Sequence, residues 1–244
     1  MNIDVRPELA TVQARLSRTL DEVRVKAAYK RHAKGYRTAR ENLVDLVDTD
    51  SFAEYGQLAV DAEAAEKASR FLQLCDAFEL PIISLTDTPG FMVGPDSEKQ
   101  AAVRRMSRLF VTGASITVPI VAIFLRKGYG LGAMAMTGGS FVTPIYSAAW
   151  PTGEFGGMGL EGAVRLGYKK ELETVEDKTE REDLFEKLVA KMYEAGKATE
   201  AAAHLEIDAV IDPADTRKVI SRALASAPKA KASHGKHRTF VDTW

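Results

Sequence analysis

The chain has 244 residues, of which 45% are hydrophobic and 27% are charged. Such a chain can bury a sizeable core without disulfides or a structural metal. The net charge of −1 gives no field that would attract nucleic acid or a membrane. The single cysteine, Cys75, excludes an internal disulfide and a cysteine-rich metal site. No apolar signal core or membrane-spanning stretch is found, so we expect a cytoplasmic protein.

The first forty residues are basic, with ten Lys or Arg against four Asp or Glu. We interpret the basic face as a solvated helix surface rather than as a nucleic-acid site. Residues 37–48 predict a second short helix, and residues 50–56 predict a turn into a strand. Apolar residues three and four apart predict one amphipathic first helix, whose stripe needs a partner: Leu9, Val12, Leu16, Leu20, Val23 and Ala27.

From about Asp61 the composition shifts, and predicted helices and strands alternate. Alternation of this kind indicates βαβ units and a mainly parallel sheet. In chain order we predict a helix over 62–78, a strand over 81–87, a helix from Ser97 to about Thr112 with a capping box to Gln100, a buried strand over 118–125, a turn over 126–130, a helix start at 131–139 and a strand within 141–150.

The last third of the chain is richer in predicted helix. A short helix is expected over 158–167 and a strand within 204–212. A final helix over 213–227 has Pro213 near its first turn, where proline is tolerated. A long charged helix is predicted over 172–200, capped near Thr174 or Thr179, with an apolar line at Leu184, Leu188 and Met192.

A glycine-rich turn between the predicted buried strand and the next helix is the first candidate site. Gly128, Gly130 and Gly132 permit close backbone approach and unusual φ angles. Free N–H groups at a helix start can hold negative charge, as an oxyanion hole does. The same glycines can also serve tight packing alone, and the turn by itself leaves both interpretations open.

Two familiar kinds of site are disfavoured. Gly130, Gly132 and Ala135, with Glu154 about twenty residues on, match a dinucleotide fingerprint. Four residues separate it from its strand and two helix–strand units precede it, which argues against a nicotinamide cofactor.

Nucleophilic machinery is also missing. No G-x-S-x-G elbow occurs, and Cys75 is expected to be a buried inert thiol. Asp87 and Glu154 lie at strand ends, where a carboxylate either acts in catalysis or bonds loop N–H groups. Phe91 and Met92 either line a pocket or fill the core. The histidines are expected to be surface residues: His32, His204, His234 and His237.

Several stretches resemble the carboxyltransferase subunits of biotin-dependent acyl-CoA carboxylases. They are RFLQLCDAFELPIISLTDTPGF, TVPIVAIFLRKGYGLGAMAM, WPTGEFGGMGLEGAV and IDAVIDPADTRKVISRAL, in family order over about 61–225. The resemblance implies an α/β, crotonase-like (ClpP/crotonase) ββα-superhelix with a helical N-terminal arm. Residues 1–60 would form the arm and the start of the first carboxyltransferase half, and 61–244 the second, carboxybiotin-binding half.

The resemblance also implies the function. Carboxybiotin on a carrier domain would give its carboxyl group to the α carbon of an acyl-CoA, and no metal is implied in this domain. Expected partners are a biotin carboxyl carrier domain, a biotin carboxylase and further copies in a dimer or hexamer. The acyl-CoA half, expected between Val60 and Asp61, is absent from this sequence. The alternatives are therefore a non-catalytic assembly or carrier-docking module, or a subunit of an acyl-CoA decarboxylase.

Site residues follow by register with the family. The backbone N–H groups of Leu131 and Gly132 would form the oxyanion hole for the biotin ureido oxygen; the family has glycine where this chain has Leu131. Met134 falls at a variable position on the pocket floor and suits an apolar acyl chain. The remaining residues implied in biotin and substrate binding are Pro89, Gly90, Phe91, Gly130 and Ala133.

Overall fold

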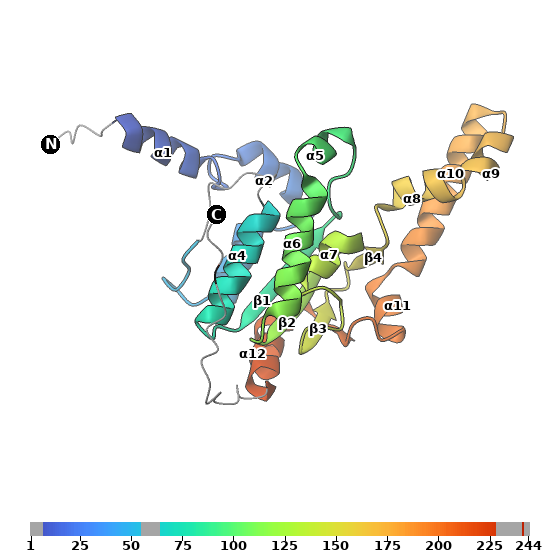
Figure 1. The fold of residues 1–244 in the computed structure, drawn as a ribbon. Coiled ribbons are helices and arrows are strands. Elements are labelled where there is room, and N and C mark those ends of the chain that lie inside the picture. Colours follow the sequence, from blue (N-terminus) through green and yellow to red (C-terminus); the bar gives the residue numbers. More distant parts are fainter. Residues whose placement is uncertain (1–6, 55–63, 228–240, 242–244) are drawn as a thin grey trace. The chain divides into compact units, whose positions relative to one another are not determined.

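The computed structural model describes residues 7–54, 64–227 and 241, and it divides the chain into two compact units, 1–64 and 65–244. The predicted domain boundary between residues 60 and 61 lies outside the described residues. Figure 1 shows the ribbon of the whole chain. None of the described helices is both long enough and apolar enough to cross a membrane.

The first unit begins with two helices where one was predicted. Helix α1 (Pro7–Ser17) ends before α2 (Val25–His32) begins, with a series of turns between them. The Ser17 and Thr19 hydroxyls donate to the carbonyls of Ala14 and Leu16, at 3.0 and 2.8 Å. Such side-chain bonds to the preceding turn weaken a helix slightly and accompany the break, which the apolar period did not reveal.

The predicted short helix over 37–48 is confirmed as α3 (Ala39–Leu46). It begins with a capping box, in which the Thr38 hydroxyl accepts from the Glu41 N–H and the Glu41 carboxylate accepts from the Thr38 N–H. Residues 51–54 form no regular element, and the rest of the strand predicted near 50–56 lies outside the described residues.

The second unit is built on a parallel sheet, as predicted. Its strands are β1 (Ile82–Thr88), β2 (Ile120–Tyr129), β3 (Tyr146–Ala149), β4 (Glu154–Gly156) and β5 (Ala209–Val210). The order is β1-β2-β3-β5, and β4 pairs with the end of β2. All four strand pairs are parallel. Strand β2 lies inside the sheet, and residues 121–124 are fully buried, which its continuous apolar run favours.

Strand β2 is longer than predicted. The prediction of a turn over 126–130 is wrong for residues 126–129, which belong to β2. Lys127, Gly128 and Tyr129 pair there with the short strand β4. Strand β4 was not predicted. Its three residues give too short a pattern to detect, and it is defined by its pairing with β2 rather than by its own composition.

Helices α4 (Ala64–Ala77), α5 (Pro95–Lys99), α6 (Ala102–Ser115) and α7 (Gly130–Met136) follow in sequence around strands β1 and β2. The predicted helix start at Ser97 is wrong. Helix α5 instead begins after Gly94, with Pro95 as its first residue, and Ala101 adopts a left-handed conformation with φ of 54° that separates α5 from α6. Helix α7 packs on β1 and β2.

The long helix predicted over 172–200 is divided. Helix α9 (Lys169–Thr174) precedes α10 (Lys178–Ala195), which begins at Asp177 because that carboxylate accepts from the N–H groups of Thr179 and Glu180. Figure 1 shows α8 (Leu160–Gly167), α9 and α10 projecting beyond the sheet. The last described helical elements are α11 (Ala198–Ala203), the 3-10 turn η2 (Pro213–Asp215) and α12 (Thr216–Ser226).

Three phenylalanines form the aromatic part of the core. Phe124, Phe141 and Phe155 meet edge to face, with ring centroids 4.9 to 5.7 Å apart. Phe155 comes from β4 and Phe124 from the centre of β2, so this cluster fixes β4 beside β2.

Candidate functional site

The site is built where β2 runs directly into α7. Tyr129 is both the last residue of β2 and the N-cap of α7. Gly130 then adopts a φ of +57°, a conformation that favours glycine. The first N–H groups of α7 have no intrahelical acceptor, as at any helix start. The turn therefore presents backbone donors at the carboxyl end of a buried parallel strand.

Two glycines of this turn lie against other backbone segments. A Cβ atom at Gly132 would lie 2.9 Å from the Cα and carbonyl carbon of Gly90. A Cβ atom at Gly130 would lie 2.6 Å from the carbonyl oxygen of Gly157. The start of α7 is thus wedged between the loop after β1 and the loop after β4, and any side chain at these positions would force the loops apart.

The structure brings most of the predicted site residues together. Gly90, with φ of +103°, and Phe91 lie against Gly132. Phe91 is half-buried and its ring meets that of Phe110 edge to face, at 6.4 Å between centroids. Pro89 is exposed in the same loop. These residues form one wall beside the start of α7.

The remaining predicted residues differ in what they can present. Leu131 is 61% exposed, so the turn is open to solvent at this position. Ala133 is fully buried in the core cluster with Phe124 and Phe155, and only its backbone can serve a ligand. Met134 is half-buried.

Asp87, at the end of β1, bonds a neighbouring strand. Its carboxylate accepts from the Lys127 N–H at 3.1 Å and pairs with the Arg126 guanidinium at 3.3 Å. This is the N–H-bonding role that was one of the two interpretations of the strand-end carboxylates.

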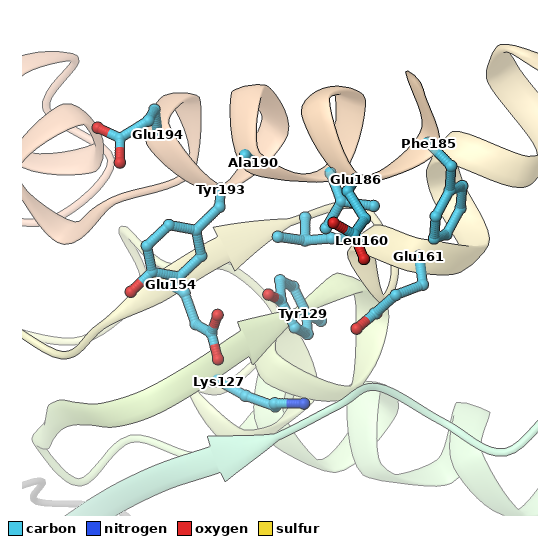
Figure 2. Close-up of a pocket in the computed structure, with 11 residues that line it drawn as sticks. Lys127, Tyr129, Glu154, Leu160, Glu161, Phe185, Glu186, Ala190, Tyr193 and Glu194 are labelled. Atoms are coloured by element: carbon cyan, nitrogen blue, oxygen red, sulfur yellow. The ribbon is translucent and has the colours of Figure 1, made fainter. Parts of the chain in front are cut away.

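A buried tyrosine beside the turn was missed by the sequence analysis. Tyr129 is 2% exposed, and Figure 2 shows its hydroxyl directed toward the Glu154 carboxylate. Burial and the nearby charge of Glu154 raise the pKa of Tyr129 well above its usual range. An aromatic residue immediately before a glycine turn was the available signal.

Two cavities lie on the side of β4 that faces α8 and α10. The first, of about 440 Å³, lies under α10 (Figure 2), and the second, of about 370 Å³, is lined mainly by apolar and glycine residues between β4 and the end of α10. Neither is lined by a residue predicted to form the oxyanion hole or to bind biotin, although Glu154, a candidate strand-end carboxylate, lines the first. The polar and aromatic lining of the first is Lys127, Tyr129, Glu154, Glu161, Phe185, Glu186, Tyr193 and Glu194.

No candidate metal-binding site is found in the part of the chain that the structure describes. There, His, Cys, Asp and Glu side chains nowhere gather in a group of three or more that could hold a metal ion. His32 pairs with Glu41 at 3.0 Å, and His204 bonds the Glu200 carbonyl at 2.9 Å. His234 and His237 lie outside the described residues.

Comparison with known proteins decides the family. Residues 59–240 match the carboxyl transferase domain. The chain belongs to the carboxyl transferase domain family. A curated relative, the biotin-dependent acetyl-/propionyl-coenzyme A carboxylase beta6 subunit of Mycobacterium tuberculosis, is 37% identical over 177 residues. The propionyl-CoA carboxylase carboxyltransferase subunit of Haloferax mediterranei is 37% identical over 158 residues.

The matched segment is a large part of this chain and a small part of its relatives. It covers 72% and 65% of this chain, and 37% and 30% of these two relatives. The chain therefore spans about a third of the length of the curated carboxyltransferases it matches.

Solved carboxyltransferases share the fold. A single-chain, multi-domain long-chain acyl-CoA carboxylase is 61% identical, with a TM-score of 0.60 over 69% of this chain and 16% of that chain. Transcarboxylase 12S, crystallised as a hexamer with methylmalonyl-coenzyme A, is 30% identical, with a TM-score of 0.62 over 74% of this chain and 35% of that chain. The predicted α/β fold of the crotonase-like carboxyltransferases is confirmed.

Proposed function

We propose that this chain is the carboxybiotin-binding half of a carboxyltransferase that moves a carboxyl group between biotin and the α carbon of an acyl-CoA. The observation that carries the proposal is the turn at Gly130–Gly132, wedged between Gly90 and Gly157 in a carboxyl transferase domain. Biotin would arrive on a carrier domain as a substrate and would supply the carboxyl group.

The chemistry asked of this chain is the stabilisation of negative charge. Backbone donors aimed at a developing oxyanion act without any nucleophile or general base from a side chain. The N–H groups of Leu131 and Gly132 are the proposed donors. The absence of Cβ atoms at Gly90, Gly130 and Gly132 lets the loops after β1 and β4 pack directly against the start of α7 and hold these donors in place.

We further propose a long, apolar acyl group. The 61% identity to a long-chain acyl-CoA carboxylase exceeds the 37% identity to the acetyl-/propionyl-coenzyme A carboxylase subunit. The half-buried Met134 would contribute an apolar surface beside the acyl chain. Met134→Asp should therefore lower transfer to long-chain acyl-CoA more than to propionyl-CoA. Met136→Asp, at an exposed position of the same helix, is the matched control. Equal effects on all chain lengths would remove Met134 from the acyl pocket.

The decisive experiment removes one backbone donor. Leu131→Pro deletes the N–H within the first turn of α7, where proline is tolerated, and the exposed position of Leu131 leaves room for the ring. Carboxyl transfer from a carboxylated acyl-CoA to free biotin should fall by roughly a hundred- to a thousandfold. Gly132→Pro is less suitable, because ring atoms there would meet Gly90.

The matched control keeps the donor and removes the side chain. Leu131→Ala retains the N–H, so it should retain most of the transfer rate, and circular dichroism should show both variants folded. A folded Leu131→Pro variant that transfers carboxyl at the wild-type rate would contradict the oxyanion assignment. A wild-type chain that binds a biotinylated carrier but transfers nothing would favour the docking-module alternative.

A further inference from the structure

The second of the two cavities beside β4 has an entirely uncharged lining. Its floor is the end of β4 and the residues that follow, and its walls are α8 and the last turn of α10. Every described residue that lines it is apolar or a glycine, so no side chain there offers a charge or an N–H or O–H donor. The apolar side chains that line it are those of Phe155, Met158, Leu160, Ala163, Met192 and Ala195.

The walls of this cavity are fixed at two points. The Phe155 N–H donates to the Gly196 carbonyl at 2.7 Å, which ties the end of α10 to β4. A Cβ atom at Gly196 would lie 2.2 Å from the Phe155 carbonyl oxygen, so a side chain there would force α10 away. Farther along the helices, the Arg165 guanidinium of α8 lies 4.5 Å from the centroid of the Phe185 ring of α10. The cavity is therefore formed in advance, which lowers the cost of binding a ligand.

The size and the mouth of the cavity suit a flexible apolar ligand. Its volume of about 370 Å³ is within the usual range for small-molecule pockets. Met158 is 42% exposed, so the cavity opens to solvent on this side. Unbranched methionine side chains, here Met158 and Met192, adapt their shape to an apolar partner.

The cavity borders the proposed site of carboxyl transfer. Gly157 lines the cavity, and its carbonyl oxygen would lie 2.6 Å from a Cβ atom at Gly130. One glycine therefore belongs both to the cavity and to the loop against the turn. A substrate whose reacting end lies at the turn can extend an attached chain into the cavity.

The neighbouring cavity under α10 does not suit such a chain. An alkyl chain there would remove water from charged groups without replacing their hydrogen bonds, which costs free energy. Figure 2 shows carboxylates on several sides of that cavity. The charged residues that line it are Lys127, Glu154, Glu161, Glu186 and Glu194.

We propose that the uncharged cavity between β4 and the end of α10 binds the far part of the alkyl chain of a long-chain acyl-CoA. This inference rests on the proposed function, which supplies the acyl-CoA. Met134 does not line this cavity, so it would contact another part of the chain. Each methylene group that enters the cavity should raise the affinity about fourfold.

The test fills the cavity from two walls. Ala163→Phe on α8 and Ala195→Phe on α10 each place a ring in the space that the alkyl chain would take. Ala190→Phe is the matched control, because Ala190 also lies on α10 but lines only the charged cavity. Circular dichroism identifies the folded variants, and either filled variant is sufficient if the other does not fold.

The first readout is binding to the full chain, measured by calorimetry with palmitoyl-CoA below its micelle concentration and with propionyl-CoA. The wild type and Ala190→Phe should bind palmitoyl-CoA at least about a hundredfold more tightly than propionyl-CoA. A folded filled variant should lose about tenfold or more of this preference. A wild type without the preference, or filled variants that retain it, would overturn the proposal. Filled variants that retain it but have a lower mass by light scattering would show that another copy of the chain occupies the cavity instead.

The second readout is carboxyl transfer between acyl-CoA and biotin. The filled variants should raise KM for palmitoyl-CoA more than KM for propionyl-CoA. If the wild type binds with the expected preference but transfers nothing, the proposed function fails and the alkyl-chain site stands. If it transfers carboxyl and the filled variants keep the wild-type preference for palmitoyl-CoA, the alkyl-chain site fails and the proposed function stands.

Discussion

Cys75 illustrates how a single residue is governed by its surroundings. It is 6% exposed and packs with Ile82 and Ile120 in a small apolar cluster. Burial, and secondarily the charge of Asp76, raise the pKa of the Cys75 thiol. The reactive species of a cysteine is the thiolate, so a raised pKa and a buried position both lower its reactivity. The interpretation of Cys75 as a buried thiol is confirmed.

The reactivity of Cys75 is directly measurable. At pH 8, iodoacetamide should label Cys75 in the folded chain at least about tenfold more slowly than in urea, where the thiol has an ordinary pKa near 8.5. Because the folded thiol has the higher pKa, the difference should persist as pH rises through 8.5. Equal labelling rates in folded and unfolded protein would show that Cys75 is accessible.

At the scale of elements, a buried carboxylate joins α4 to the segment that leads into β2. Asp76 is 6% exposed. Its Oδ1 accepts from the Thr117 N–H at 2.6 Å, the Thr117 hydroxyl at 3.0 Å and the Val118 N–H at 3.1 Å. These backbone donors lie outside any helix or strand, so the side chain takes the place of a secondary-structure partner.

Loss of this carboxylate should destabilise the second unit. Asp76→Ala would remove the shared acceptor of the Thr117 and Val118 N–H groups, which are only partly shielded from water, and should lower the free energy of unfolding by about 1–3 kcal/mol. Asp76→Asn keeps an oxygen acceptor and should cost roughly half as much. Urea denaturation measures both, with the exposed Asp96→Ala as a control expected within about 0.5 kcal/mol of wild type. An Asp76→Ala variant as stable as the control would show that these bonds contribute nothing net.

At the scale of the whole molecule, the described part of the second unit exposes many large apolar side chains. Strand β1 ends the described path of the sheet. Ile83 on β1 and Phe78 and Leu80 before it are 42%, 70% and 53% exposed, and Val103 and Val111 on α6 are 61% and 67% exposed. Apolar surface of this kind commonly marks an interface.

We expect the purified chain to self-associate. Light scattering at micromolar concentration should give a mass at least twice that of the monomer, because burial of these side chains removes apolar surface from water. Replacement of Val103 and Val111 by lysine tests whether this surface of α6 takes part. A wild-type chain that stays monomeric at these concentrations would contradict the prediction.

The sequence by itself determined the class of the fold and the family. Local composition predicted α4, β2 and α12, because each of these elements is long enough to show its character within its own residues. The continuous apolar run at 118–125 predicted a strand buried on both faces, and residues 121–124 are fully buried. The ordered stretches over about 61–225 indicated the carboxyltransferase family, which the match over 59–240 confirms.

Only the tertiary structure decided how the site is assembled. Strand β4 exists because it pairs with Lys127–Tyr129, and the same pairing extends β2 through the predicted turn. The contact of Gly132 with Gly90 joins positions that are far apart in sequence, as does the pairing of Tyr129 with Gly156. Local propensity carries no information about which distant segments meet. The glycines could therefore be noticed in the sequence, but the backbone against which each one packs depends on the folded sheet.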